Sequence, residues 1–205
     1  MPLSGKRTPG EVNTHIVVLV GPSGAGKSTV AGELFSRYQD LTFITSCTTR
    51  PPREGDLRAK KEYTYLKEGE FQKMADANLF LWQELYDGAR YGTEEKRVQE
   101  AEDGNNRIMI LVPQRAKTLI KKVEERGWAL DIFTFYLTVK PEELIRRLSR
   151  RYGSDKEKIR SRFEVSRGWE QEARDNGFIP IPNERNEAAP GKEAASLISQ
   201  KLGWL

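Results

Sequence analysis

Residues 21–28 (GPSGAGKS) constrain this chain more than any other segment, because their glycines, lysine and serine follow a fixed spacing. They come directly after His15–Val20, a β-branched run typical of a strand that is buried on both faces of a parallel sheet. We expect a helix to begin near Lys27. A strand, a glycine-rich loop and a helix in this order predict a phosphate-binding loop (P-loop), in which backbone amides and the positive end of the helix surround phosphates. An ordinary glycine turn would not need the lysine and the hydroxyl at these two positions.

This P-loop predicts a site for ATP and Mg²⁺. Lys27 is expected to reach the terminal phosphates, and Ser28 is expected to ligate the metal. The residues expected to bind ATP here are Gly21, Ser23, Gly24, Ala25, Gly26, Lys27, Ser28 and Thr29.

Apolar runs alternate with helical stretches along the rest of the chain, which predicts an α/β fold with a central parallel sheet flanked by helices. The expected further strands are Leu41–Thr45, Ile108–Val112, Phe133–Val139 and Phe178–Ile181. The expected helices are Ser28–Tyr38, Gln114–Arg126, Lys192–Leu202 and two charge-rich helices after Pro141. Glu62–Leu66 and Leu79–Leu85 look like short strands of an inserted subdomain, linked by an acidic helix around Glu68–Ala77.

Composition limits the class of protein. The 205 residues, 37% of them hydrophobic, suit one domain over residues 14–205, and residues 1–13, rich in Gly, Pro and polar residues, are expected to form a disordered leader. One cysteine and one histidine exclude a disulfide scaffold and a His-based zinc site. No apolar run approaches the roughly 20 residues of a membrane span. We therefore expect a cytoplasmic protein, a monomer or homodimer.

The charge balance bears on the partners. The 34 basic residues are spread among 30 acidic ones, and no basic stripe is interleaved with aromatic residues. This argues against a nucleic-acid kinase and favours small anionic ligands.

A second group of residues predicts an acceptor site. Residues 46–56 (SCTTRPPREGD) place Arg50 and Arg53 three residues apart in a loop that prolines stiffen, and forked guanidiniums suit a bound phosphate. Tyr63 and Tyr91 add phenolic hydroxyls. The alternatives from the residues alone are a solvated basic loop and aromatic side chains that simply belong to the core.

Taken together, GPSGAGKST, TTRPPREGD, EYTYL and YGT occur in the order and approximate spacing of the guanylate kinase family, which this chain resembles over most of its length. The resemblance implies a kinase that uses Mg-ATP to phosphorylate a nucleoside monophosphate. It implies an acceptor-binding subdomain at about residues 46–93. The residues that it assigns to the acceptor are Arg50, Arg53, Tyr63 and Tyr91 for the phosphate, with Ser46 and Thr93 nearer the base.

The same resemblance implies a helical lid at about residues 147–165. Arg147, Arg151 and Arg162 match arginines that approach the ATP phosphates and the transferring group, and Asn183 matches an asparagine that contacts adenine. Read alone, these arginines also fit a salt-bridged helix surface, since glutamates lie at helical spacing from them. Next to a P-loop, a ring of guanidiniums would stabilise the charge on the transferring phosphoryl group, because phosphoryl transfer depends on positioning and electrostatic stabilisation.

The chain departs from the family where guanine would be read. The glutamate that the family carries matches Leu81 or Trp82 here, and Glu84 lies just beyond, out of register. The family's Asp-x-Asp pair matches the apolar end of Ile108–Pro113. Carboxylates normally accept the guanine N–H protons, so an altered base preference is expected. The metal would then rest on Ser28, phosphates and water.

Two further functions stay open. Ribose bisphosphate phosphokinases, which are relatives of guanylate kinases, resemble this chain in an apolar strand followed by Gln114-Arg115-Ala116, whereas TTRPPREGD is more like the nucleotide kinases. Guanylate kinase-like domains also serve as phosphopeptide-binding modules, but such modules generally lack the working P-loop that this chain carries.

Overall fold

A computed structural model describes residues 14–52, 62–184 and 189–204. The expectations for the leader and for Arg53 lie outside these residues. The chain forms two compact units, each of which is described by itself. Unit 1 comprises Met1–Val17, Asp40–Met109 and Thr118–Ile132, and unit 2 comprises Val18–Gln39, Ile110–Lys117 and Phe133–Leu205.

A five-stranded parallel sheet has the strand order β2-β7-β1-β8-β9. Its strands are β1 (Thr14–Val20), β2 (Thr42–Phe43), β7 (Arg107–Leu111), β8 (Leu130–Thr138) and β9 (Ile179–Pro182). The β2–β7 and β8–β9 pairings are parallel, with Phe43 opposite Ile108 and Leu137 opposite Ile181. The prediction of an α/β fold with a central parallel sheet is therefore confirmed.

Burial explains why β1 is central in this sheet. Ile16, Val17, Val18, Leu19 and Val20 are all fully buried, as expected for a strand with covered faces on both sides. Each such side chain contributes about 1.5–3 kcal/mol through burial. The strand ends at the glycine-rich loop, so the best-packed strand of the sheet carries the P-loop.

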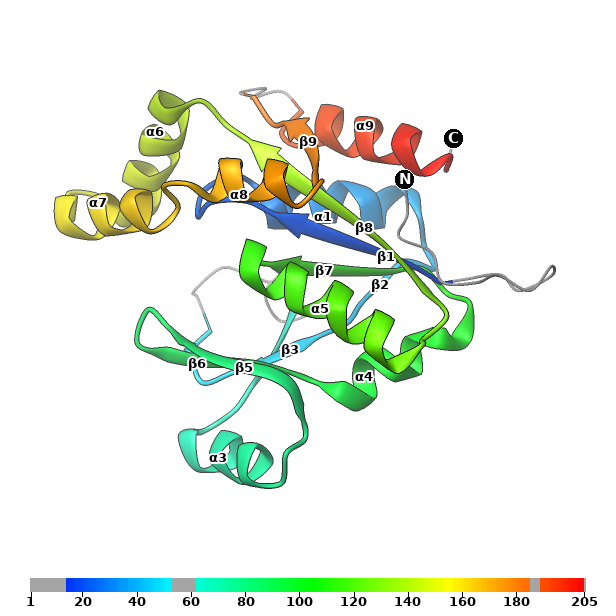
Figure 1. Ribbon diagram of the computed structural model, residues 1–205. Helices are drawn as coiled ribbons and strands as arrows, with labels where there is room; N and C mark the ends of the chain where they lie inside the picture. The colour runs from blue at the N-terminus through cyan, green and yellow to red at the C-terminus, as the bar shows by residue number, and fades with distance from the viewer. Residues whose placement is uncertain (1–13, 53–61, 185–188, 205) are drawn as a thin grey trace. The chain divides into compact units, whose positions relative to one another are not determined.

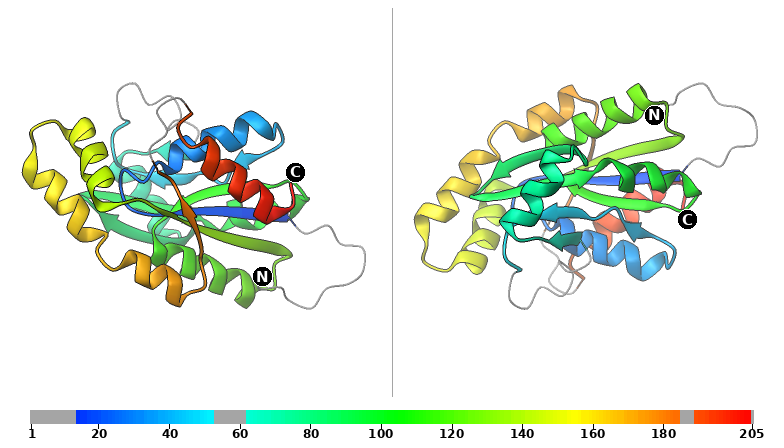
Figure 2. Two further views of the ribbon diagram at one scale, coloured as in Figure 1. Left: turned by 90° about the horizontal axis from the view of Figure 1, so that it is seen from above. Right: turned by 90° about the horizontal axis from the view of Figure 1, so that it is seen from below.

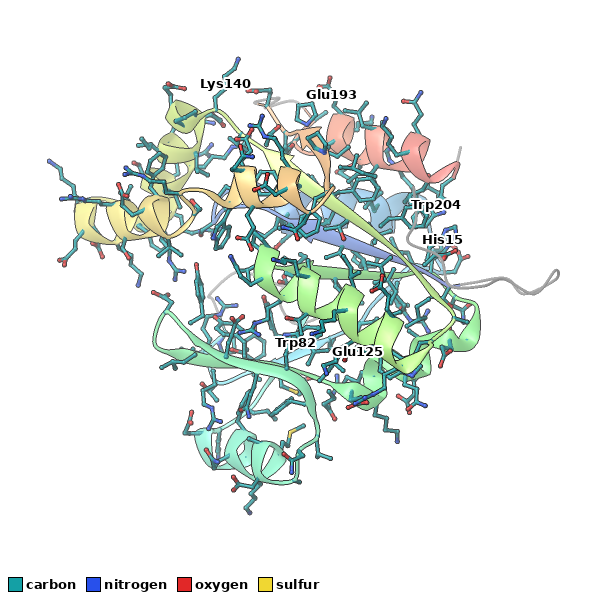
Figure 3. The ribbon with its side chains drawn as sticks, viewed as in Figure 1. His15, Trp82, Glu125, Lys140, Glu193 and Trp204 are labelled. Carbon is teal, nitrogen blue, oxygen red and sulfur yellow. The ribbon has the colours of Figure 1, made fainter. Side chains whose placement is uncertain are left out.

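In unit 2, helix α9 (Lys192–Leu202) lies beside α1 (Lys27–Arg37) in both views of Figure 2. Near the start of α9 their contact is polar, since Arg37 donates to Ser196 Oγ and to the Lys192 carbonyl. Beyond the end of α9 the contact is aromatic. The rings of Tyr38 and Trp204 meet edge to face with their centroids 5.0 Å apart. Glu193 and Trp204, labelled in Figure 3, mark the two ends of α9.

In unit 1, a separate four-stranded sheet has the order β4-β3-β6-β5. Its strands are β3 (Ser46–Thr48), β4 (Tyr63–Tyr65), β5 (Phe80–Tyr86) and β6 (Ala89–Glu94). Helix α3 (Glu68–Asp76) covers one face of this sheet (Figure 1). Phe71 of the helix stacks there on Phe80, with the ring centroids 4.5 Å apart. Arg90 lies over the Phe71 ring and donates to Glu68, Gln72 and Gln83, which ties this helix to the sheet.

The remaining helices are α4 (Glu95–Gln99), the 3₁₀ helix η1 (Glu100–Asp103), α5 (Pro113–Arg126), α6 (Pro141–Tyr152), α7 (Lys156–Val165) and α8 (Trp169–Asp175). The helices predicted at Ser28–Tyr38, Glu68–Ala77, Gln114–Arg126 and Lys192–Leu202 are confirmed, as are the two after Pro141. The predicted strand at Leu41–Thr45 is reduced to two residues. Strands β3 and β6, helices α4 and α8, and the 3₁₀ helix η1 were not predicted. None of the described helices is long and apolar enough to cross a membrane.

Candidate active site

The P-loop connects the end of β1 at Val20 to the start of α1 at Lys27. Gly26 is the N-cap of α1 and has a φ of 90°, a left-handed conformation that favours glycine. A Cβ at Gly26 would lie 2.5 Å from Asn183 Nδ2. Both the backbone conformation and the close approach of another side chain therefore require glycine at this position.

Lys27 is held against the loop that precedes it. Its Nζ donates to the carbonyl oxygens of Gly21 at 2.6 Å and Pro22 at 2.9 Å. The next residue is Ser28, in the first turn of α1. The lysine and the serine thus lie at the N-terminus of α1, where the backbone amides and the helix dipole favour an anion.

Asn183 follows β9 and is only 6% exposed. Its Nδ2 donates to the Ala25 carbonyl at 2.6 Å, and its backbone N–H donates to the Thr138 carbonyl at 2.9 Å. A buried amide side chain with a definite partner is fixed in orientation. The last strand of the sheet therefore braces the P-loop through Asn183.

Arg147 connects helix α6 to the same loop. Its Nη2 donates to the Asn183 carbonyl at 2.9 Å, and its Nη1 lies 3.3 Å from the Ala25 carbonyl. One turn further along α6, Arg151 Nη1 lies 3.5 Å from Ser23 Oγ. The structure thus brings two of the predicted lid arginines to the P-loop.

Glu143 orients these arginines from one turn earlier in α6. Its carboxylate accepts from Arg147 Nε at 2.7 Å and from Arg146 at 2.7 and 2.8 Å. The hydrogen bond from Arg146, and then that from Arg147, lower the pKa of Glu143 to about 2. With this lowered pKa, Glu143 stays ionised at neutral pH although only 11% of its side chain is exposed, and it keeps both guanidiniums in place.

These groups line a cavity of about 570 Å³ within unit 2, a size suited to a nucleotide. The predicted residues on its wall are Gly24, Gly26, Thr29, Arg147, Arg151 and Asn183. Arg162, also predicted, lies on α7, is 8% exposed and is not part of this wall.

The wall also contains residues that the sequence did not assign to the site, among them Glu143, Arg150 and Gly191. Glu143 lies four residues before Arg147, on the same face of α6, and Arg150 directly precedes Arg151. The helical spacing was therefore an available signal for Glu143, and the Arg-Arg pair was one for Arg150. Gly191, the N-cap of α9, reaches the cavity only through the packing of α9 on α1, which no local pattern reveals.

The candidate acceptor residues gather in unit 1 on the four-stranded sheet. Ser46 Oγ and Thr93 Oγ1 share a hydrogen bond of 2.7 Å, and the rings of Tyr63 and Tyr91 lie 6.0 Å apart. The guanidinium of Arg50 lies 5.5 Å from the centre of the Tyr63 ring. Burial, and then Glu62, raise the pKa of Tyr63 well above its usual value, so this phenol is a hydrogen-bond donor at neutral pH.

The metal donors in the described part of the chain are few. No group of three His, Cys, Asp or Glu side chains there could hold a metal ion. Strand β7 ends in Ile110 and Leu111, and Val112 follows. This end of the strand therefore offers no carboxylate as a metal ligand. The Ser28 hydroxyl fits Mg²⁺ bound with nucleotide, because this ion takes one or two protein ligands and completes its shell with phosphates and water.

A glycine-rich loop between strand and helix, braced by arginines around a nucleotide-sized cavity, defines a P-loop protein of the kinase type. The family model for guanylate kinase matches residues 13–179. The chain belongs to the guanylate kinase family.

Individual relatives agree with this assignment. A guanylate kinase of Caldanaerobacter subterraneus subsp. tengcongensis is 35% identical over 150 residues, which are 72% of this chain and 69% of that protein. A guanylate kinase of Carboxydothermus hydrogenoformans is 32% identical over 189 residues, 91% of this chain and 89% of that protein. The crystal structure of guanylate kinase from Anaplasma phagocytophilum superposes with a TM-score of 0.67 at 20% identity, covering 94% of this chain and 86% of that chain, and supports the fold.

Proposed function

We propose that this protein transfers the γ-phosphoryl group of Mg-ATP to the phosphate of a nucleoside monophosphate, giving a nucleoside diphosphate. The observation that carries the proposal is the P-loop cavity, in which Arg147 and Asn183 from distant parts of the chain converge on the loop carbonyls. Membership of the guanylate kinase family supports the same reaction type.

On the donor side, residues 21–29 bind the ATP phosphates. Lys27 exchanges its bonds to the Gly21 and Pro22 carbonyls for bonds to phosphate oxygens. Arg147, Arg151 and Arg162, in a lid at about residues 147–165, offset the charge that develops on the transferring group. Asn183 contacts the adenine.

On the acceptor side, a subdomain at about residues 46–93 binds the monophosphate. Arg50, Arg53, Tyr63 and Tyr91 hold its phosphate, and Ser46 and Thr93 lie nearer its base. The acceptor phosphate oxygen is itself the nucleophile and attacks the γ-phosphorus in line, so the protein needs no nucleophilic side chain. Exclusion of water by the lid prevents ATP hydrolysis.

Magnesium belongs to this proposal as the ion that accompanies ATP. Ser28 would hold it, and the ion would neutralise charge on the phosphates.

A second candidate is a ribose 1,5-bisphosphate phosphokinase. The apolar end of β7 favours it, because an acceptor without a base needs no carboxylate there. The TTRPPREGD segment favours the nucleotide kinase.

The deciding experiment is an assay of ADP release by the purified protein with Mg-ATP and each nucleoside and deoxynucleoside monophosphate, plus ribose 1,5-bisphosphate. A Lys27→Ala preparation, purified identically, measures contaminating kinases. Activity on a nucleoside monophosphate supports the proposal, and activity on the sugar bisphosphate alone replaces it with the second candidate. If the protein phosphorylates neither a nucleoside monophosphate nor the sugar bisphosphate, both candidate functions are overturned.

A further inference from the structure

The carboxylate of Glu143 stands among the cations of the P-loop cavity. The wall of this cavity carries Glu143 and four arginines of α6, which are Arg146, Arg147, Arg150 and Arg151. A carboxylate repels the phosphates of a nucleotide, so attraction to ATP alone would favour a neutral residue at this position. A benefit of Glu143 to ATP binding can therefore come only through the side chains that it contacts.

The guanidinium of Arg147 is fixed by two short hydrogen bonds. Its Nε donates to Glu143 Oε1 at 2.7 Å, and its Nη2 donates to the Asn183 carbonyl at 2.9 Å. Because a guanidinium is rigid and planar, bonds from two of its nitrogens set both its position and its plane. Glu143 is thus one of the two groups that orient Arg147.

The third nitrogen of this guanidinium, Nη1, is bound least strongly. It lies 3.3 Å from the Ala25 carbonyl and 3.4 Å from the Gly24 carbonyl, distances at which a hydrogen bond is weak. A Cβ built on Gly26 would lie 3.6 Å from Nη1, so this nitrogen is beside the N-cap of α1. The proposed function puts the ATP phosphates at that helix end, where Nη1 can exchange its two long contacts for a phosphate oxygen.

Arg146 differs from Arg147, because two of its nitrogens bind the same carboxylate. Its Nε and Nη2 donate to the two oxygens of Glu143 at 2.7 and 2.8 Å. A bidentate pair of this kind has a defined geometry, so Arg146 holds the carboxylate in one orientation. Orientation therefore passes from Arg146 through Glu143 to the guanidinium of Arg147 at the P-loop.

Helix α6 is held to the P-loop by apolar contacts as well. Leu144 and Leu148 are 5% and 0% exposed. A Cβ on Gly24 would lie 3.2 Å from the Leu144 side chain and 3.4 Å from that of Leu148, so both leucines pack on the loop. Replacement of Glu143 should therefore leave α6 in place and release the guanidinium of Arg147.

We propose that Glu143 is a positioning residue for the phosphoryl donor: it holds Arg147 so that Nη1 faces the ATP phosphates. This inference rests on the proposed function and concerns its donor site. Ordering a long side chain during binding costs conformational entropy, and a contact that already exists in the free protein lowers this cost. Preorganisation and charge repulsion predict opposite results for removal of the carboxylate, since loss of the first weakens ATP binding and loss of the second strengthens it.

The first test is Glu143→Gln, which keeps the size of the side chain and removes its charge. We expect the dissociation constant for Mg-ATP, measured by calorimetry without an acceptor, to rise about 3- to 10-fold. Glu142→Gln is the matched control, because Glu142 is an exposed glutamate in the same first turn of α6. This control removes the same charge from the helix N-terminus and should bind Mg-ATP as wild type does. An unchanged or lower dissociation constant in Glu143→Gln overturns the proposal.

A double-mutant cycle with Arg147→Lys shows whether Glu143 acts through Arg147. A lysine has one ammonium group in place of the fork, so it cannot bind Glu143 with one nitrogen and a phosphate with another. In the Arg147→Lys background, Glu143→Gln should therefore change the dissociation constant for Mg-ATP by less than about twofold. If Glu143→Gln weakens binding equally in both backgrounds, Glu143 does not act through Arg147 and the proposal is wrong.

Binding and turnover together separate this inference from the proposed function. A wild type that binds Mg-ATP but phosphorylates no acceptor contradicts the proposed function, and the two binding experiments then still decide the role of Glu143. A wild type that does not bind Mg-ATP overturns both. With an active wild type, Glu143→Gln should raise the KM for ATP and leave the KM for the acceptor unchanged, whereas an equal rise in both would indicate a general structural effect and contradict the inference.

Discussion

The P-loop cavity and the candidate acceptor residues on the four-stranded sheet are built from different kinds of contact. Around the P-loop, Lys27, Arg147 and Asn183 all donate to main-chain carbonyls, and Gly26 has no room for a Cβ. Among the candidate acceptor residues, the groups that meet are side chains on a hydrogen-bonded sheet, such as the Ser46–Thr93 pair.

This difference bears on what each region tolerates. A side chain that braces the main chain cannot change without moving the loop, so chemistry and backbone geometry are coupled in the cavity. A side chain on a regular strand can be exchanged while the ladder of backbone bonds persists. The proposed base-reading positions, Leu81 or Trp82, lie on such a strand, β5, whereas the P-loop motif is complete.

Removing Lys27 should have the largest effect. Lys27→Ala should lower kcat by about 1000-fold or more, because the charge that develops in the transition state loses a cation that offsets it. Steady-state ADP release measures this, with Lys201→Ala on α9 as an exposed control. Turnover within tenfold of wild type would remove Lys27 from the proposed chemistry.

Arg50 tests whether the two regions act separately. Arg50→Ala should raise the acceptor KM about 10- to 100-fold and leave the dissociation constant for ATP unchanged, since the lost contact is on the acceptor phosphate. Arg50→Lys should recover only part of the loss, because lysine lacks the fork. Kinetics and calorimetry with ATP measure the two quantities, and an unchanged acceptor KM would contradict the assigned role.

The apolar end of β7 can be tested by adding the carboxylate that it lacks. Val112→Asp should raise kcat/KM for GMP about tenfold, because an aspartate can accept guanine N–H bonds. Val112→Asn has the same shape without the charge and serves as the control. If the aspartate brings no gain with GMP, the alignment of this strand with the family, or the inference drawn from it, is wrong.

The smallest expected effect concerns Glu143. Its pKa in the folded state, about 2, lies below the ordinary value of 4.5, so its contribution to stability is fully present above about pH 4.5 and is lost as the pH falls toward 2. Because such pairs are partly screened, Glu143→Gln should reduce the free energy of unfolding by only about 1 kcal/mol at pH 7. Denaturation curves at several pH values should show this difference vanish toward pH 2, and a constant difference would refute the ion-pair explanation.

Several features could be predicted from local sequence. The glycine, lysine and serine spacing predicted the P-loop between β1 and α1, and the apolar runs predicted most strands of the parallel sheet. Strands β3 and β6 escaped prediction because they are rich in polar residues and pair with each other, for example through Thr48 and Tyr91. Strand β3 is also only three residues long. Helix α8 is similarly short, and its first residue, Trp169, is buried by tertiary packing.

The sequence by itself determined the class of chemistry, because the P-loop motif joins conformation and function within eight consecutive residues. Only the tertiary structure decided that Gly191 also lines the P-loop cavity, because α9 packs on α1. It also decided that Glu84 lies opposite Tyr91, because the two-residue turn at Asp87 and Gly88 sets the pairing of β5 with β6. A local pattern specifies the conformation of neighbouring residues, whereas the face that a strand residue occupies depends on partners that are distant in sequence.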